Sequence, residues 1–136
     1  MGVRNFRYWF YAAAFYNLIW GLLNILFPKD YFQWIGVNIP INLPVWQVVG
    51  MFVLVYAPAY WWAGNYPERH YHLILVGLVG KILGPVGFTW ALMTGQLPPA
   101  FGWIILTNDL IWLPAFFLYF KRILSSRSIV NVLFGE

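Results

Sequence analysis

Two charged residues stand in stretches of this chain that are otherwise apolar enough to cross a lipid bilayer. Lys81 lies in the middle of one such stretch, and Asp109 lies inside the next. A charge in hydrocarbon is costly unless it is paired or hydrated, so residues of this kind usually mark a packed polar site. Such a site offers an ion pair, a proton donor and acceptor, or a place to bind a polar group.

The depth of these residues in the bilayer suggests that they meet. Asn17, Lys81 and Asp109 each lie about ten residues into an apolar stretch, which puts them roughly 15 Å deep, near the bilayer midplane. A short turn joins the stretches that hold Lys81 and Asp109, so these two run antiparallel as neighbours. We therefore predict a Lys81–Asp109 ion pair, with Asn17 and Asn108 available to complete its hydrogen bonds.

Two tryptophans share helical faces with these polar residues. Trp20 lies on the face of Asn17, and Trp112 lies on the face of Asp109. Both could wall a flat apolar ligand, although packing against small residues of a neighbouring helix is the favoured interpretation. The predicted polar cluster or ligand site therefore consists of Asn17, Trp20, Lys81, Asn108, Asp109 and Trp112.

Several interpretations of this cluster remain open. A structural ion pair that fixes helix register is the simplest. A site for a small amphipathic or anionic ligand is the second, because polar residues inside membranes mark functional sites by default. Ion or proton conduction would need titratable groups across the whole membrane, and the chain supplies one cluster. An enzyme that uses Lys81 or Asp109 as acid or base ranks lowest.

Other catalytic chemistry has little support in the sequence. The chain has no cysteine, which excludes thiol chemistry and disulfides. His70 and His72 point to different sides of a helix and cannot easily share a metal, although one of them could ligate a haem or chlorophyll-type ring. Serine occurs only in the C-terminal tail, so no catalytic triad is present as a pattern. We predict no catalytic residue and no metal site, and any cofactor is unknown.

The composition indicates that membrane-spanning helices position the cluster. Of the 136 residues, 62% are hydrophobic and only 9% are charged, whereas soluble domains carry about 25% charged residues. Four apolar segments of membrane-spanning length are visible, at about 7–27, 43–63, 71–95 and 99–120. We therefore predict an all-α integral membrane protein, a four-helix transmembrane bundle that forms a single domain over residues 1–136.

Small and polar residues recur on one face of the first three spans, and in a bilayer such faces turn toward protein. In the first two spans these faces comprise Ala13, Asn17, Trp20, Gly21 and Asn24, and then Gln47, Gly50, Leu54, Ala57 and Trp61. The third span has a predicted helix-packing face of Gly77, Gly80, Gly84 and Gly87. Pro58 and Pro85 lie inside the second and third spans, where each predicts a bend.

The basic residues predict the topology. Six of them flank one side of the spans, against Lys29 alone on the other side: Arg4, Arg7, Arg69, Lys121, Arg122 and Arg127. The positive-inside rule then places both termini and the 64–70 loop in the cytoplasm, and we expect a multi-pass protein of the cell inner (cytoplasmic) membrane. An aromatic segment at about 29–36 is predicted to lie in the outer interface, and the tail 121–136 to dock on lipid or on a partner. Nucleic acid is a poor partner for so few charges.

Three segments together resemble an uncharacterised family of small bacterial four-span membrane proteins. They are the runs 15–21 (FYNLIWG), 77–85 (GLVGKILGP) and 108–112 (NDLIW), with 66–70 (YPERH) similar to the family's cytoplasmic turn. More loosely, the architecture resembles the DoxX-like four-helix proteins. Some relatives carry a label of alkyl hydroperoxide reductase, but that chemistry needs a peroxidatic cysteine, which this chain lacks. The resemblance implies fold and membrane location and no activity.

The functional expectation is a non-catalytic membrane protein that packs against lipid and other membrane subunits, as an accessory subunit of a larger complex. Its basis is the aromatic, charge-poor exterior of a chain without a catalytic constellation. The alternative is a membrane protein that binds a small amphipathic ligand, quinone-like or lipid-derived, at the Lys81–Asp109 cluster.

Overall fold

The computed structural model describes residues 2–40 and 42–134, and its regular structure there is entirely helical. Four helical segments are long and apolar enough to cross a membrane: Val3–Leu26, Leu43–Asn65, Tyr71–Met93 and Pro99–Ser126. The prediction of an all-α protein with four candidate spans is confirmed. In the first segment the 3-10 helix η1 (Val3–Phe6) leads into α1 (Arg7–Leu26), and the second and third are α3 (Leu43–Asn65) and α4 (Tyr71–Met93).

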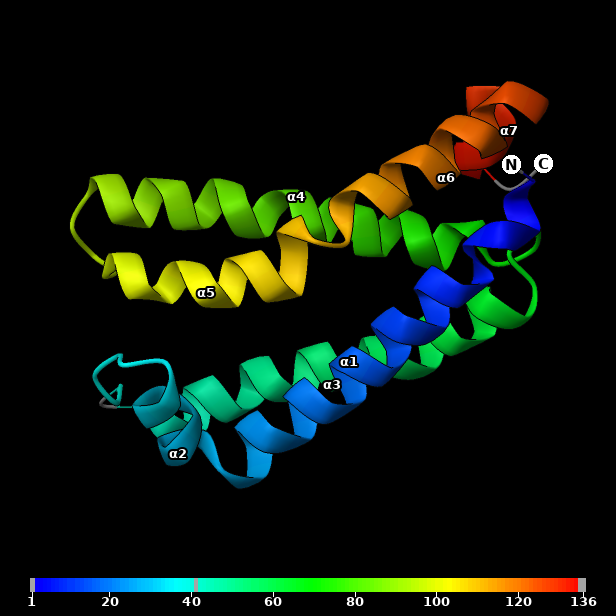
Figure 1. Cartoon of the computed structure of the whole chain (residues 1–136). Coiled ribbons are helices and arrows are strands. Elements are labelled where there is room, and N and C mark those ends of the chain that lie inside the picture. The colour runs from blue at the N-terminus through cyan, green and yellow to red at the C-terminus, as the bar shows by residue number, and fades with distance from the viewer. Residues whose placement is uncertain (1, 41, 135–136) are drawn as a thin grey trace.

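The fourth segment covers the span predicted at about 99–120, but its helix is interrupted. It consists of η2 (Pro99–Phe101), α5 (Gly102–Ile105), the π-helical η3 (Leu106–Leu110) and α6 (Leu113–Ser126). Figure 1 shows the chain changing direction between α5 and α6. The second and third spans, in contrast, stay helical through Pro58 and Pro85. The interruption falls beside Asp109 and just before Pro114, a proline in the first turn of α6 that cannot donate a backbone hydrogen bond to the Leu110 carbonyl.

Two short helices complete the chain. Helix α2 (Pro28–Trp34) fills most of the segment predicted at 29–36, and α7 (Ile129–Phe134) ends the described part of the tail. Trp34 on α2 is exposed, as an interfacial anchor should be, but Phe32 is buried. Helix α2 therefore also packs on the rest of the chain. The last two residues of the predicted tail, 135 and 136, lie outside the described residues.

Helices α1 and α3 form one closely packed antiparallel pair (Figure 1). The whole predicted face of α1, from Ala13 to Asn24, is buried. On α3, Gly50 and Ala57 are buried as predicted and Gln47 and Leu54 are half-buried, but the prediction is wrong for Trp61, which is exposed. Small residues at the contact let the two backbones approach, because a side chain on Gly21 would meet the Gly50 carbonyl.

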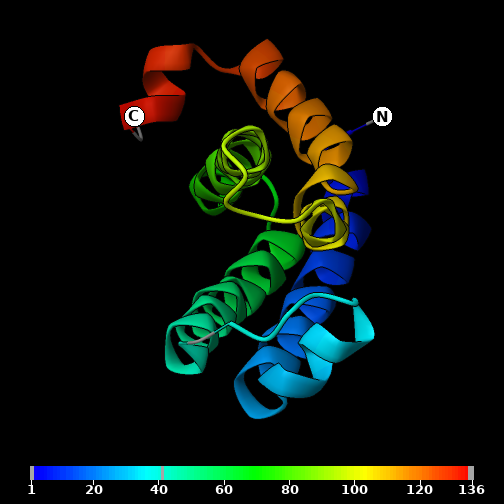
Figure 2. The ribbon, with the colours of Figure 1, turned by 90° about the vertical axis from the view of Figure 1, so that its left-hand side faces the viewer.

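The second antiparallel pair, α4 with α5 and η3, meets the first pair near the middle of the molecule and diverges from it toward α2 (Figures 1 and 2). Aromatic rings bridge the two pairs at that end, where the ring centroids of Trp46 and Phe101 are 5.8 Å apart. The space between the pairs is the setting of the site described below.

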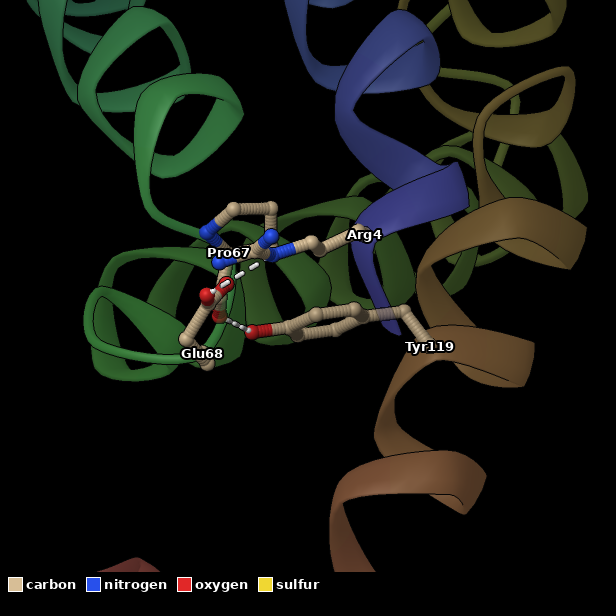
Figure 3. A network of polar contacts seen from close by, with 4 residues as sticks. All are labelled: Arg4, Pro67, Glu68 and Tyr119. Carbon is tan, nitrogen blue, oxygen red and sulfur yellow. Dashed lines mark hydrogen bonds and ion pairs between the residues drawn. The ribbon is translucent and has the colours of Figure 1, made fainter. Parts of the chain in front are cut away.

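Elements that carry the basic residues gather at the opposite end, which holds η1, the turn between α3 and α4, and the end of α6 (Figure 1). Arg4 Nε lies 3.2 Å from Glu68 Oε1, and the Tyr119 hydroxyl donates to the Pro67 carbonyl (Figure 3). A hydrogen bond from its own backbone N–H lowers the pKa of Glu68, and Arg4 lowers it further. This contact contributes stability above the ordinary glutamate pKa and loses it as the pH falls.

The close approach of α1 and α3 makes a test of the fold. In Gly21→Ala the new Cβ would lie 2.8 Å from Leu54 Cβ and 3.0 Å from the Gly50 carbonyl oxygen. Since the backbone must shift to relieve this overlap, we expect a loss of about 1–3 kcal/mol in unfolding free energy. The measurement is thermal unfolding in detergent.

Gly87→Ala is the matched control, because a Cβ at Gly87 would meet nothing within 4 Å. We expect this variant to unfold at the wild-type temperature or slightly above it, since alanine is the better helix former. Equal destabilisation by the two substitutions would contradict the packing of α1 on α3.

Candidate functional site

A pocket of about 240 Å³ lies where the two helix pairs meet. It brings together four of the six residues predicted for the polar cluster: Asn17, Lys81, Asn108 and Asp109. Helices α3 and α4 supply the remaining walls, with Val49, Phe52, Val53, Tyr56, Tyr60, Gly77 and Gly80. The pocket therefore has a polar floor near mid-span and mostly apolar walls.

Lys81 does not pair with Asp109, and the predicted ion pair is wrong. Among the described residues the only ion pair is Arg4–Glu68, at the basic end. Instead, Lys81 Nζ donates a hydrogen bond of 2.6 Å to the backbone carbonyl of Asn108. The Lys81 side chain is only 5% exposed, so this bond forms in the interior of the protein.

The Asn108 carbonyl is free to accept this bond because the helix changes register around it. In an α-helix its donor would be the backbone N–H of Trp112. That N–H bonds to the Asp109 carbonyl instead, at 3.1 Å, as the π-helical segment ends. An unpaired carbonyl in a bilayer costs several kcal/mol, so a side-chain donor is needed. Lys81 supplies it from the neighbouring helix.

A second carbonyl released by the same break is also satisfied by a side chain. The backbone N–H of Ile111 bonds to the Leu106 carbonyl, a π-type bond that bypasses Thr107. The indole Nε1 of Trp112 then donates to the Thr107 carbonyl at 2.8 Å. Lys81 and Trp112 thus act as a pair of caps on the interrupted fourth span.

Three aromatic rings also lie near the Lys81 ammonium group. Its Nζ lies 5.7 Å from the ring centroid of Tyr60, 5.9 Å from that of Trp112 and 5.5 Å from that of Phe116. Each distance is within the range of a cation–π interaction. These rings offset part of the cost of burying the charge, which explains how the lysine is tolerated without an acidic partner.

Asp109 and Asn108 present acceptors close to this lysine. The Asp109 carboxylate lies directly against Gly84 of α4, where a Cβ would overlap it. The side-chain oxygen Oδ1 of Asn108 is buried and has no hydrogen-bond partner among the described residues. Asn17, in contrast, is engaged, because its Nδ2 donates to the Val53 carbonyl at 3.2 Å.

The glycine face of α4 divides into two parts. Gly77 lies against the ring of Tyr60, and Gly84 lies against Asp109, as predicted for helix-packing positions. A Cβ at Gly80 or Gly87 would meet nothing within 4 Å, so neither glycine packs against the described part of the chain. Because Gly77 and Gly84 have no side chain, Tyr60 and Asp109 can lie against α4, and both line the pocket.

Trp20 lies apart from the cluster, contrary to the prediction. Its Nε1 donates to the Tyr31 hydroxyl at 2.9 Å, and its ring packs on Trp46 at 5.9 Å. It faces α2 and the start of α3, because it lies almost one turn beyond Asn17 toward α2. Trp112 is near Lys81, as expected.

Tyr56 and Tyr60 line the pocket from α3 but are not among the residues predicted for the cluster. A signal was present, because two tyrosines four residues apart share one helical face, and their position within a span is unusual for interfacial rings.

The two histidines lie at the basic end, outside the pocket. The His70 ring packs near Tyr66, at 6.2 Å between centroids, and the His72 ring near Tyr71, at 4.1 Å. In the part of the chain that the structure describes, no group of three or more potential metal-ligating side chains is found. That His70 or His72 ligates a haem or chlorophyll-type ring stays a prediction.

The rim of the pocket is open to the surroundings of the protein between α3 and α4. Val49, Phe52 and Gly80 all line the pocket, and all three are exposed. Because these helices are candidate spans, the surroundings at this depth are lipid. The site can therefore exchange molecules sideways with the bilayer.

No family model matches this chain, and no curated protein or solved structure matches it either. The chemistry of the site consequently rests on its own geometry: a caged ammonium group, a buried amide oxygen and a carboxylate beside an apolar opening.

Replacing Lys81 tests its role as a cap. In Lys81→Met the Asn108 carbonyl loses its donor, and we expect a loss of about 1–3 kcal/mol in unfolding free energy, as for other unsatisfied buried acceptors. Thermal unfolding in detergent measures this. Lys29→Met is the control, because Lys29 is exposed at the opposite end, and it should leave stability unchanged. A Lys81→Met protein as stable as wild type would contradict the capping role.

Proposed function

We propose that this protein binds a small amphipathic molecule, quinone-like or lipid-derived, in the pocket around Lys81. The observation that carries the proposal is that the polar groups of the pocket form fewer hydrogen bonds than they can. A lysine ammonium has three donors, and the structure gives Lys81 one hydrogen bond, to Asn108. The buried Asn108 Oδ1 has no partner among the described residues. Donors and an acceptor are thus available side by side.

These groups define the head of the ligand. An oxygen of a carbonyl, carboxylate or phosphate group would accept from Lys81 Nζ, and a hydroxyl would donate to Asn108 Oδ1 or to Asp109. A volume of about 240 Å³ is small for a complete drug-sized molecule. A single ring or a polar head fits it, with the apolar remainder passing Val49 and Phe52 into lipid.

We also propose in which membrane the protein lies and which of its ends faces the cytoplasm. The basic residues gather at the end that holds η1 and the end of α6 (Figure 1), and the positive-inside rule supports a cytoplasmic position for that end. A bacterial inner membrane is the location we propose. We also propose that the chain belongs to the four-span family that its motifs resemble.

Thermal unfolding with two probes tests the proposed ligand class. A short-chain ubiquinone and oleate are each added to the detergent-solubilised wild-type protein and to Lys81→Met. We expect at least one probe to raise the midpoint of the wild type, because binding to the native state stabilises it, and to leave that of Lys81→Met unchanged.

Lys29→Met is again the matched control and should respond as the wild type does. The proposal fails if neither probe stabilises the wild type, or if Lys81→Met is stabilised to the same degree.

A second candidate is the role of accessory subunit in a larger membrane complex. The observation that favours it is the open space at Gly80 and Gly87 on α4, which the described chain leaves uncovered. Small residues at such positions let another transmembrane helix approach closely. In this function the protein would be non-catalytic.

Native mass spectrometry after purification in mild detergent tests this second candidate. We expect the native complex to contain a further membrane protein, and Gly80→Leu to release it while the chain itself stays folded. A monodisperse monomer without any bound subunit would count against the accessory role.

A further inference from the structure

A second apolar groove lies at the basic end of the molecule, away from Lys81. It has a volume of about 620 Å³ and runs between the first turns of α4 and the second half of α6. Its lining comprises Leu75, Leu78, Phe117, Phe120, Lys121, Leu124 and Ser125. Figures 1 and 2 show α6 separating from α4 toward this end.

The shape of the groove suits a lipid acyl chain. Phe117 and Leu124 are exposed, so the groove opens to the lipid around the protein. From Phe117 to Ser125 the lining extends roughly 12 Å along α6, about the length of the upper half of an acyl chain. A void of this size in a bilayer would leave its walls without contacts, so an apolar chain must fill it.

The polar end of the groove is basic. Lys121 belongs to the lining, and Arg122 and Arg127 follow on the same side of the membrane. Among the described residues none of these three takes part in an ion pair, since the only one joins Arg4 to Glu68. Their charges are therefore available to an anionic group at the lipid surface.

Helix α7 closes this end as an interfacial element. Its Val132 is buried against the core, and Arg127, just before it, lies 5.1 Å from the ring centroid of Tyr71. Its other apolar side chains face outward: Ile129, Val130, Leu133 and Phe134. A helix anchored on one side and apolar on the other fits at the level of the lipid headgroups, beside the mouth of the groove.

We propose that the groove between α4 and α6 is a binding site for one anionic phospholipid. An acyl chain lies along Leu78, Phe117 and Phe120, and the phosphate group lies at the Lys121 ammonium. The long apolar stem of the lysine follows the helix surface, so its charge can reach the headgroup level. Charge complementarity selects this occupant over a zwitterionic lipid.

Native mass spectrometry of the whole chain in detergent, titrated with one lipid at a time, tests the proposal. Dioleoyl phosphatidylglycerol and dioleoyl phosphatidylcholine have the same tails and differ in headgroup charge. We expect phosphatidylglycerol to bind more tightly to the wild type. Lys121→Gln should weaken phosphatidylglycerol roughly fivefold, as for one basic side chain near a charged surface, and leave phosphatidylcholine unchanged.

Two matched controls make the result specific. Lys29→Gln removes the same charge from an exposed lysine at the opposite end and should bind both lipids as the wild type does. Leu124→Trp fills the groove and should weaken both lipids, whereas Leu118→Trp alters an exposed leucine of the same helix outside the lining and should not.

Three results would overturn the proposal. They are equal affinity of the wild type for both lipids, an equal loss in Lys29→Gln and Lys121→Gln, and equal binding by Leu124→Trp and Leu118→Trp. The first would show that headgroup charge is not selected, the second would leave a general surface charge effect, and the third would leave an unoccupied groove.

Discussion

The hydrogen bond from Lys81 Nζ to the Asn108 carbonyl is the constraint on which the centre of the molecule depends. Backbone groups inside a bilayer must be satisfied by the protein, because no water is present to do so. The π-helical turn in the fourth span leaves two backbone carbonyls without a helical donor. The side chains of Lys81 and Trp112 donate hydrogen bonds to them. The break and the buried charge therefore require one another.

This mutual requirement also explains the position of the pocket. At the basic end, Arg4–Glu68 and Tyr119–Pro67 tie η1 and α6 to the turn between α3 and α4 (Figure 3), and the helix pairs α1–α3 and α4–α5 diverge toward α2. Where they begin to diverge, the caged ammonium group of Lys81 holds η3 against α4. Irregular backbone at membrane depth occurs where it is buried or lines a cavity, and Asn108 lines the pocket.

The sequence predicted the number of spans, their approximate ends and the buried face of α1, because apolar length and the spacing of small residues report these features directly. It also brought Asn17, Lys81, Asn108 and Asp109 to one site from depth alone. It could not predict the partner of Lys81, because that depends on the register of the fourth span. A one-residue shift between α and π bonding frees the Asn108 carbonyl, and no residue type encodes such a shift. The prediction for Trp20 was wrong for a related reason. Helical spacing shows which face of α1 a residue shares, but not which other helix lies against that face at a given depth.

A solid-state NMR distance measurement tests this account most directly. The protein would carry ¹⁵N at lysine Nζ and ¹³C at asparagine backbone carbonyls, and would be studied in lipid bilayers. The account predicts a dipolar coupling that corresponds to less than about 4 Å between Lys81 Nζ and the Asn108 carbonyl carbon, absent in Lys81→Met. A spectrum of the wild type without that coupling, or with one that persists in Lys81→Met, would contradict it.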